Sequence, residues 1–317
     1  MDIKIRLRRF FFGSIYSLYA GVLHTLLSSF SLQPEPRLII DATNTQTCLP
    51  KHFRTSLDPL TDEEANSEGL RSLNIAGSGQ FSARELKEAI AKIGSDPAIW
   101  LIDLRQECHC FLNGIAISLY AKHNAANFGK SLEQCASDER AMIQTLRHEK
   151  EITLHTAKPY AGKVDEPQEI EVLSCVSEEE LAKSQGVTYV RLPVTDHMTP
   201  DAKTVDRFLQ LVQTVPSNCW LYFHCRGGDG RTSSFMIMYD MLKNAKTRTF
   251  EEILTRQWHL GGKNLGEVPD KCNWRSFRKE ERYYFLHQFY DYCRQKDPNS
   301  TQTFSDWLHN RAVFAKL

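Results

Sequence analysis

The sequence predicts an α/β protein in which helices cover a central sheet. Its second half alternates between apolar runs of the length of a buried strand and stretches in which apolar residues recur at helical spacing. In chain order these patterns predict a helix over 177–185, a strand over 189–194, a helix capped by Thr199 with Pro200 at its first position, a strand over 219–224 and a helix over 232–243. Such alternation is typical of a sheet built from strand–helix units.

The first half adds elements of both kinds. Ser82 is placed to cap a helix that runs to about Ile93, and the apolar run 98–102 predicts a buried strand. The other expected elements are a helix over 131–149, half-buried strands over 151–157 and 169–175, and helices over 250–258 and 275–294. Residues 33–75 are rich in Pro, Thr, Asn and Asp, which favours an extended, turn-rich lead-in.

The N-terminus differs from the rest of the chain. Lys4, Arg6, Arg8 and Arg9 precede an uncharged run over 10–32. A basic segment followed by an apolar one is typical of a secretory signal peptide, and the run is also long enough for a membrane anchor. We therefore predict that residues 1–32 are a signal peptide or an anchor, with a buried or amphipathic helix as the alternative. The protein is then secreted or periplasmic, or it is held at a membrane through residues 1–32 alone.

Charge and cysteine content restrict the partners. The 39 basic and 39 acidic residues balance, so no overall field attracts nucleic acid, and an anionic ligand needs a local cluster of cations. There are nine cysteines, an odd number, which leaves at least one thiol unpaired. The only tight Cys/His cluster, at 108–110, fits no common zinc spacing, so we predict neither a metal nor another cofactor.

One loop carries the chemistry. Between the strand over 219–224 and the next helix stand His224, Cys225, Arg226, Gly227, Gly228, Asp229, Gly230, Arg231 and Thr232. Backbone N–H groups of such a loop and the N-terminus of the helix favour a phosphate dianion, and they also favour a thiolate. Cys225 is then the nucleophile, Arg231 grips two phosphate oxygens, and Thr232 donates a hydrogen bond to the thiolate when it leaves. The alternative is a buried cysteine in a glycine-rich turn, which explains neither Arg231 nor the three glycines.

The departing alkoxide of a phosphate ester needs a general acid. Asp196 is the best candidate, because it follows a strand and precedes a helix 29 residues before Cys225. The simpler interpretation is a turn residue, a position that aspartate favours.

The loop resembles the signature loop of the protein tyrosine phosphatase superfamily. Further stretches resemble the cysteine phytases, the protein tyrosine phosphatase-like (PTP-like) myo-inositol polyphosphate phosphatases of bacteria. The matching stretches are 53–56, 73–82, 102–109, 113–114, 126–131, 195–197, 261–262 and 288–292, in one order over roughly residues 45–310.

This resemblance implies a protein tyrosine phosphatase-like α/β fold with a small, partial β-barrel domain, so residues 33–317 are expected to form a phosphatase domain with an inserted small β domain. It implies stepwise removal of phosphates from myo-inositol hexakisphosphate, without a metal, in a pocket lined by basic residues. The positions that match substrate contacts are Arg54, Asp103, Asp196, His197, Cys225 and Arg231, with Lys271 and Arg275 by weaker alignment. The remaining loop residues His224, Arg226, Gly227, Gly228, Asp229 and Gly230 are expected to bind the same phosphate. His155 and Lys158 lie near a further basic position of the family.

Several positions leave alternatives open. Arg226 stands where the family often has an acidic residue, and it either reinforces the binding of a polyanion or points to solvent. His197 is a phosphate contact or a turn residue, and Asp103 arranges the pocket or forms a plain ion pair. The segment after Gly262 is shorter and has fewer lysines than the family pattern, and the charges over 275–282 are either part of the pocket or a solvated helix face.

The proposed substrate is a small polyanionic phosphate. A protein tyrosine or phosphoinositide phosphatase with the same loop is the nearest alternative function. A catalytically inactive phosphate-binding module and a sulfur transferase are more distant alternatives. Oligomeric state is not predicted.

Overall fold

The structure is a computed structural model that describes residues 36–94, 98–121, 124, 126–156, 165–267, 273–297 and 300–314. The predicted signal peptide or anchor, residues 1–32, lies outside these ranges. Contacts divide the chain into Met1–Pro36 and Arg37–Leu317, and only the second unit is considered below. Within the described ranges, no helix combines the length and the apolar character needed to cross a bilayer.

The centre of the unit is a five-stranded sheet with the strand order β10-β4-β11-β3-β2. Its strands are β2 (Arg54–Thr55), β3 (Ile75–Ser78), β4 (Ile99–Arg105), β10 (Thr188–Val194) and β11 (Trp220–His224). The strands β10, β4, β11 and β3 run parallel, and β2 pairs with β3 in the antiparallel direction. Every residue of β11 is buried, as expected for the middle strand of a parallel sheet covered on both faces.

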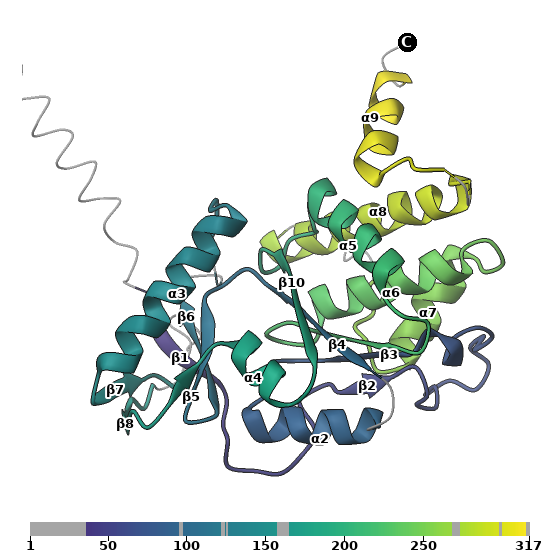
Figure 1. Cartoon of the computed structure of the whole chain (residues 1–317). Coiled ribbons are helices and arrows are strands. Elements are labelled where there is room, and N and C mark those ends of the chain that lie inside the picture. Colours follow the sequence, from purple (N-terminus) through teal and green to yellow (C-terminus); the bar gives the residue numbers. More distant parts are fainter. Residues whose placement is uncertain are drawn as a thin grey trace, which may run out of the picture. The chain divides into compact units, whose positions relative to one another are not determined.

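Helices cover both faces of this sheet (Figure 1). The larger apolar core contains residues of α5 (Ala202–Thr214), α6 (Gly230–Asn244), α7 (Phe250–His259), α8 (Trp274–Gln295) and α9 (Phe304–Phe314). The smaller core contains residues of α2 (Ala83–Ile93) and α4 (Glu178–Ser184). This arrangement confirms the predicted α/β fold.

A second, smaller sheet has the strand order β1-β6-β5-β9 and is antiparallel throughout. Its strands are β1 (Arg37–Ala42), β5 (His109–Leu112), β6 (Ile115–Tyr120) and β9 (Cys175–Val176). A third core lies between this sheet, the helix α3 (Leu132–His148) and the two-stranded ribbon of β7 (Glu151–Leu154) and β8 (Gln168–Glu171). The described strands do not close into a ring, so the partial barrel stays a prediction.

Local signals explain most element boundaries. Ser82 accepts a hydrogen bond from Glu85 N, and the Glu85 side chain bonds back to Ser82 N, so α2 begins with a capping box where the sequence predicted it. The predicted start of α5 is wrong. Asp201, and not Thr199, is the N-cap, because its carboxylate accepts a 2.7 Å hydrogen bond from Thr204 N. Pro200 therefore precedes the helix.

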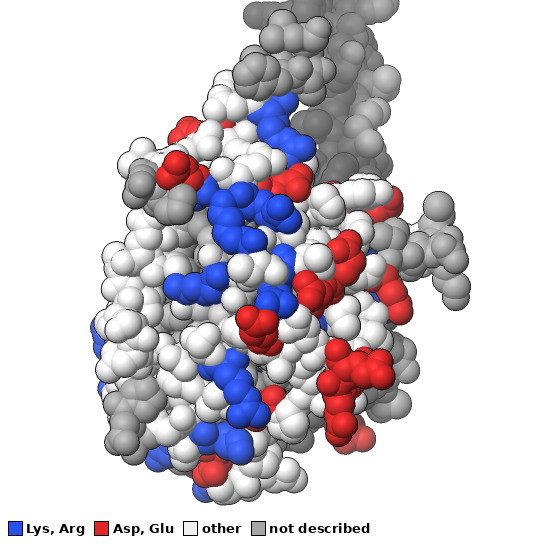
Figure 2. All heavy atoms as spheres, turned by 90° about the vertical axis from the view of Figure 1, so that its right-hand side faces the viewer, with Lys and Arg blue, Asp and Glu red and all other residues white. Residues whose placement is uncertain are grey.

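Charges on the surface are mixed in sign. The face in Figure 2 carries Lys and Arg side chains together with Asp and Glu side chains. This mixture agrees with the balanced composition, and a basic site has to be sought in a local cluster.

Candidate active site

The loop that follows β11 holds Cys225 at the N-terminal end of α6. The Cys225 residue is 3% exposed, and its Sγ accepts hydrogen bonds of 3.2 Å from Gly228 N and 3.2 Å from Thr232 Oγ1. Thr232 thus lies where the predicted hydrogen bond to the leaving thiolate requires it, and that role stays a prediction. Both donors stabilise a negatively charged sulfur at this place.

The tight wrap of this loop depends on Gly228 and on the neighbouring strand β3. Gly228 has φ +77°, and a Cβ atom there would lie 2.4 Å from Gly79 N. The backbone of Gln80 also donates a 3.1 Å hydrogen bond to Arg226 O. The residues after β3 therefore press against the loop and fix its path.

The two terminal nitrogens of the Arg231 guanidinium both have acceptors. Its Nη1 and Nη2 donate to the two Glu107 carboxylate oxygens at 2.8 and 2.9 Å, and Nη1 also donates to Val194 O at 2.9 Å. Its Nη2 lies 2.9 Å from Asp196 Oδ1. Burial opposes the charge, but the carboxylates of Asp196 and Glu107 raise the pKa of Arg231 well above its ordinary value. Arg231 Nε is buried and has no hydrogen-bond partner among the described residues.

Asp196 lies just beyond β10, within reach of this guanidinium. Its side chain is 21% exposed, and its Oδ2 accepts a 3.0 Å hydrogen bond from Asn124 Nδ2. Burial raises the pKa of Asp196, but the Arg231 guanidinium outweighs it and holds the pKa below its ordinary value. The predicted acid and the predicted phosphate ligand Arg231 are therefore brought together.

Glu107 was not recognised from the sequence, although it organises the site. Besides Arg231, it accepts hydrogen bonds from Arg105 Nε at 3.0 Å and from Asn124 Nδ2 at 2.9 Å. Burial raises the pKa of Glu107, but the guanidinium groups of Arg231 and Arg105 hold it well below its ordinary value. The only local signal was its place shortly after a buried strand that ends in Arg105.

Arg226 does not point to solvent, and its role in binding a polyanion stays a prediction. Its Nε lies 2.6 Å from Asp41 Oδ1 on β1, and its guanidinium stacks 4.9 Å from the centre of the Tyr120 ring. Asp41 Oδ2 in turn lies 2.9 Å from Arg105 Nη2. Arg226 thus connects the Cys225 loop to the smaller sheet, and its side chain is only 11% exposed.

Behind the loop lies a buried polar cluster. His224 Nε2 is 2.5 Å from Glu178 Oε1, and His109 Nε2 is 3.1 Å from Glu178 Oε2. Burial raises the pKa of Glu178, but these two histidines hold it well below its ordinary value. The sequence analysis had predicted only that Glu178 lies in a helix over 177–185.

Asp103 belongs to the same buried cluster. The Asp103 residue is 0% exposed, and its Oδ2 accepts a 2.8 Å hydrogen bond from Tyr189 OH. This burial contradicts the expected substrate contact. Asp103 instead forms an ion pair, the stated alternative, with Arg191, whose Nε lies 3.1 Å away. Asp103, His109 and Glu178 lie close enough together to hold a metal ion. Because Asp103 and Glu178 already have the hydrogen-bond and ion-pair partners described above, we assign these three residues a structural role.

Two further guanidinium groups flank the loop. Arg54 is 2% exposed and donates to Gly228 O at 3.2 Å and to Ser233 Oγ at 3.0 Å. Burial lowers the pKa of Arg54 to about 10, although the charges of Cys225 and Asp229 act to raise it.

Arg282 of α8 does not lie on a solvated helix face, which was one of the two alternatives for residues 275–282. It is 7% exposed and donates to His197 O at 3.1 Å and to Met198 O at 3.0 Å, so it holds the segment that follows Asp196. A Cβ at Gly230 would lie 2.7 Å from Arg282 Nη1, so the guanidinium rests directly on the loop. Burial and the nearby Arg231 lower the pKa of Arg282 to about 10.

The rim contains the other predicted residues. His197 has φ +65°, a conformation typical of a turn, and its ring packs edge-on against Trp274 at 5.0 Å. Burial and the charges of Arg231, Arg282 and Arg275 lower the pKa of His197, although Asp196 acts to raise it. Arg275 is therefore near enough to the site to interact with His197. Asp229 lies at the surface, 3.1 Å from His52 Nδ1.

The basic residues that were matched to the family with less certainty do not share one environment. Lys271 and Lys158 lie outside the described residues. His155 pairs with Asp165, its ring Nδ1 lying 2.5 Å from the carboxylate, and its backbone bonds to β1. Arg278 pairs with Glu281 at 2.6 Å and stacks on Trp274, so it is neither wholly solvated nor free.

Comparison with known proteins identifies the family. The family model for PTP-like phytases, whose description reads "Inositol hexakisphosphate", matches residues 102–243. A solved PTP-like phytase from Bdellovibrio bacteriovorus is 31% identical, with a TM-score of 0.70, over 87% of this chain and 96% of that one. This chain belongs to the PTP-like phytase family. The recognition made from the sequence is therefore confirmed, and so are the fold class and the membership in a family of phosphoric monoester hydrolases.

Two further proteins that are similar to this chain are longer than it is. The PTP-like myo-inositol phosphatase from Mitsuokella multacida, solved with myo-inositol-(1,3,4,5)-tetrakisphosphate, is 32% identical, with a TM-score of 0.83, over 88% of this chain and 48% of that one. "Effector protein hopD2" from Pseudomonas syringae pv. tomato is 35% identical over 272 residues, which are 81% of this chain and 57% of the relative. The chain thus spans about half the length of these relatives.

Proposed function

We propose that this PTP-like phytase hydrolyses phosphomonoesters of myo-inositol polyphosphates through a phosphocysteine intermediate on Cys225. The observation that carries the proposal is the environment of the Cys225 sulfur. Two hydrogen-bond donors reach it at 3.2 Å, and the buried guanidinium groups of Arg54, Arg231 and Arg282 lie near enough to interact with its charge. No metal is needed, because these residues supply the positive charge.

In the first step the substrate phosphate occupies the concave side of the loop, where backbone N–H groups and the N-terminus of α6 favour an anion. Arg231 shares its donors with two phosphate oxygens. The thiolate of Cys225 attacks phosphorus, so a sulfur–phosphorus bond forms while the bond to the inositol oxygen breaks. Asp196 gives its proton to that oxygen, so the inositol leaves with a hydroxyl group at this position.

In the second step Asp196 acts as a base. Its carboxylate takes a proton from a water molecule, whose oxygen attacks phosphorus and displaces the sulfur. Inorganic phosphate is released and the thiolate returns to its hydrogen bonds with Gly228 N and Thr232 Oγ1. Glu107 remains ionised throughout and keeps Arg231 in place.

The substrate class follows from the number of cations. A polyphosphorylated ring places several negative charges in a small volume, and Arg275 and the turn at His197 add polar groups at the rim of a site that already has three buried guanidinium groups. The Mitsuokella relative, solved with an inositol tetrakisphosphate, supports the same class of ligand. The alternative, a protein tyrosine or phosphoinositide phosphatase, uses the same loop and acid, so only the rim distinguishes it.

The test is phosphate release from phytate, a phosphotyrosine peptide and a short-chain phosphoinositide, compared at equal concentration. We expect phytate to have the highest kcat/KM and expect Cys225→Ser to abolish turnover of all three. Cys219→Ser is a matched control, because Cys219 lies at the opposite end of β11. Preference for the peptide or the lipid would keep the chemistry but overturn the substrate class.

We further propose that the protein acts outside the cell that makes it, with residues 1–32 as its export or anchoring segment. The relative named an effector protein supports export. Comparing the mature N-terminus of exported protein with the sequence would decide between cleavage and anchoring.

A further inference from the structure

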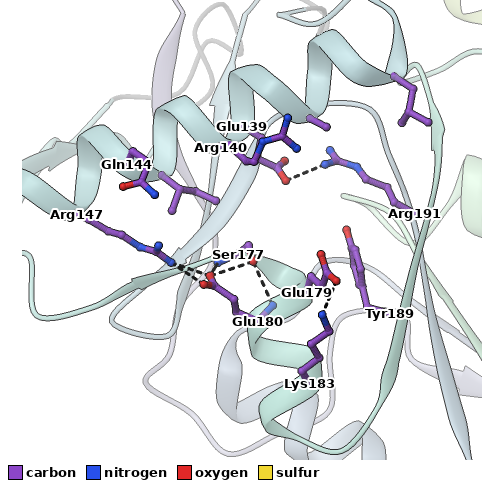
Figure 3. Close-up of a pocket in the computed structure, with 13 residues that line it drawn as sticks. Glu139, Arg140, Gln144, Arg147, Ser177, Glu179, Glu180, Lys183, Tyr189 and Arg191 are labelled. Carbon is purple, nitrogen blue, oxygen red and sulfur yellow. Dashed lines mark hydrogen bonds and ion pairs between the residues drawn. The ribbon is translucent and has the colours of Figure 1, made fainter.

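A cavity of about 600 Å³ lies away from the Cys225 loop, between α3, α4 and β10 (Figure 3). None of the residues that line it belongs to the loop over 224–232. Its volume falls within the range of roughly 300–1,000 Å³ that is usual for small-molecule sites. The proposed phosphatase chemistry leaves this cavity without a role.

The back wall of the cavity is rigid. Arg191 donates to Glu139 Oε1 at 2.8 Å, to Arg105 O at 2.9 Å and to Glu107 O at 3.0 Å, so each nitrogen of its guanidinium has an acceptor. Tyr189 is fixed beside it by the hydrogen bond of its hydroxyl group to Asp103. The wall is therefore formed before any ligand arrives, which lowers the cost of ordering on binding.

The cavity lining has one more cation than acids, with Arg140, Arg147, Lys183 and Arg191 against Glu139, Glu179 and Glu180. Figure 3 shows Arg147 paired with Glu180 and Lys183 paired with Glu179, at 2.7 Å in each case. Both pairs are exposed, and such pairs contribute only about 0–1 kcal/mol, so a ligand anion exchanges with them at little cost.

Arg140 completes the set. It has no hydrogen bond or ion pair with any described residue, and the nearest acid on its own helix, Glu139, is already bound to Arg191. Guanidinium binds phosphate, sulfonate and carboxylate groups in a bidentate manner. Arg140 is therefore the natural anchor for an anion at the wall formed by α3.

The floor beside Arg140 is apolar. Leu132, Ala136 and Ile143 of α3 line the cavity, and the ring of Tyr189 faces it from β10. A ligand that only carried charge would leave this surface in contact with water. An apolar body attached to the anionic group would instead cover it, at a gain of roughly 25 cal/mol for each Å² buried.

We propose that this cavity is a second binding site, for a small amphipathic anion that carries one phosphate, sulfonate or carboxylate group on a flat apolar body. The anionic group binds Arg140, and the body lies on Ala136, Ile143 and the Tyr189 ring. The site is independent of the phosphatase chemistry proposed above.

The probe is anilinonaphthalene sulfonate, whose fluorescence rises in apolar surroundings, titrated into the full chain. Orthovanadate at saturating concentration occupies the Cys225 loop, so that only binding elsewhere is measured. We expect saturable binding that orthovanadate leaves unchanged. We expect Arg140→Ala to weaken it about tenfold, the effect of one charge-assisted hydrogen bond of about 1.4 kcal/mol.

Two further variants keep the test decisive. Ala136→Trp fills the cavity and is expected to abolish binding, while phosphate release with the same variant shows that the protein is folded. Arg71→Ala removes an exposed arginine of the short helix η1 (Arg71–Leu73) and is expected to change nothing. No saturable binding up to about 1 mM probe, binding lost with orthovanadate, or equal affinity of Arg140→Ala and Arg71→Ala would each overturn the proposal.

Discussion

Arg231 Nη2 lies 2.9 Å from Asp196 Oδ1, so the two groups proposed to serve one phosphate are paired with each other in the free site. This pair holds the pKa of Asp196 below its ordinary value, so the carboxylate is ionised at rest. A bound phosphate that takes the Arg231 donors removes this stabilisation and adds negative charge beside Asp196, and both changes raise its pKa. We infer that substrate binding itself converts Asp196 into an acid.

Asp196→Asn is expected to lower kcat for an inositol phosphate by about 10²–10⁴-fold, the usual contribution of a general acid. The loss is expected to be much smaller for p-nitrophenyl phosphate, because its phenolate leaves without a proton. Asp201→Asn is the matched control, since asparagine caps a helix as well as aspartate does. Equal losses for both substrates would argue against the acid role.

Glu107→Gln is expected to damage both stability and activity. The variant leaves Arg231 and Arg105 buried with one carboxylate fewer, and breaking a buried pair costs roughly 3–5 kcal/mol. Urea unfolding measures this loss, and kinetics on the folded protein should show a raised KM together with a reduced kcat. Glu171→Gln, on an exposed position of β8, changes the net charge equally and should leave both quantities unaltered.

The sequence predicted those parts of the site whose residues must stand a fixed number of positions apart for the chemistry to work. The loop from His224 to Thr232 is a continuous string, and a short β–loop–α unit allows little freedom in where its side chains lie. Asp196 was found because it stands between a predicted strand and a predicted helix, on the kind of loop where the superfamily that the Cys225 loop resembles carries its general acid. The capping box of Ser82 and Glu85 was readable for the same reason, because its partners are three residues apart.

Residues that act through long-range contacts were not predictable in this way. Glu107 meets Arg231 across 124 positions of sequence, and Arg282 meets the backbone of His197 across 85. The ion pair of Arg226 with Asp41 was not predicted, because Asp41 lies on a strand that the sequence analysis had placed in an irregular segment. Nothing in the sequence near these residues identifies the distant partners that they contact.

Gly228→Ala is expected to distort the backbone of the Cys225 loop. The left-handed conformation at φ +77° costs a residue with a Cβ about 1–2 kcal/mol, and the new atom would lie 2.4 Å from Gly79 N. Gly227→Ala is the matched control, because its nearest neighbour is the flexible Asp229 carboxylate at 3.7 Å. Thermal unfolding and phosphate release should both fall in the first variant far more than in the second. Similar behaviour of the two would show that the loop path does not depend on Gly228.

The dependence of stability on pH offers a test of the buried cluster behind the loop. The pKa of Glu178 is held well below its ordinary value, so the folded state keeps the carboxylate ionised where the unfolded chain takes up a proton. A group with a lowered pKa contributes stability that is fully present above its unfolded pKa of about 4.3 and is lost as the pH falls further. The free energy of unfolding should therefore drop between about pH 5 and about pH 3, and the drop should be shallower in Glu178→Gln. Urea titrations across this range measure both slopes, with Glu171→Gln as the variant that should keep the wild-type slope because its carboxylate is exposed on β8. An unchanged slope in Glu178→Gln would mean that the Glu178 ion pairs with His224 and His109 do not stabilise the fold.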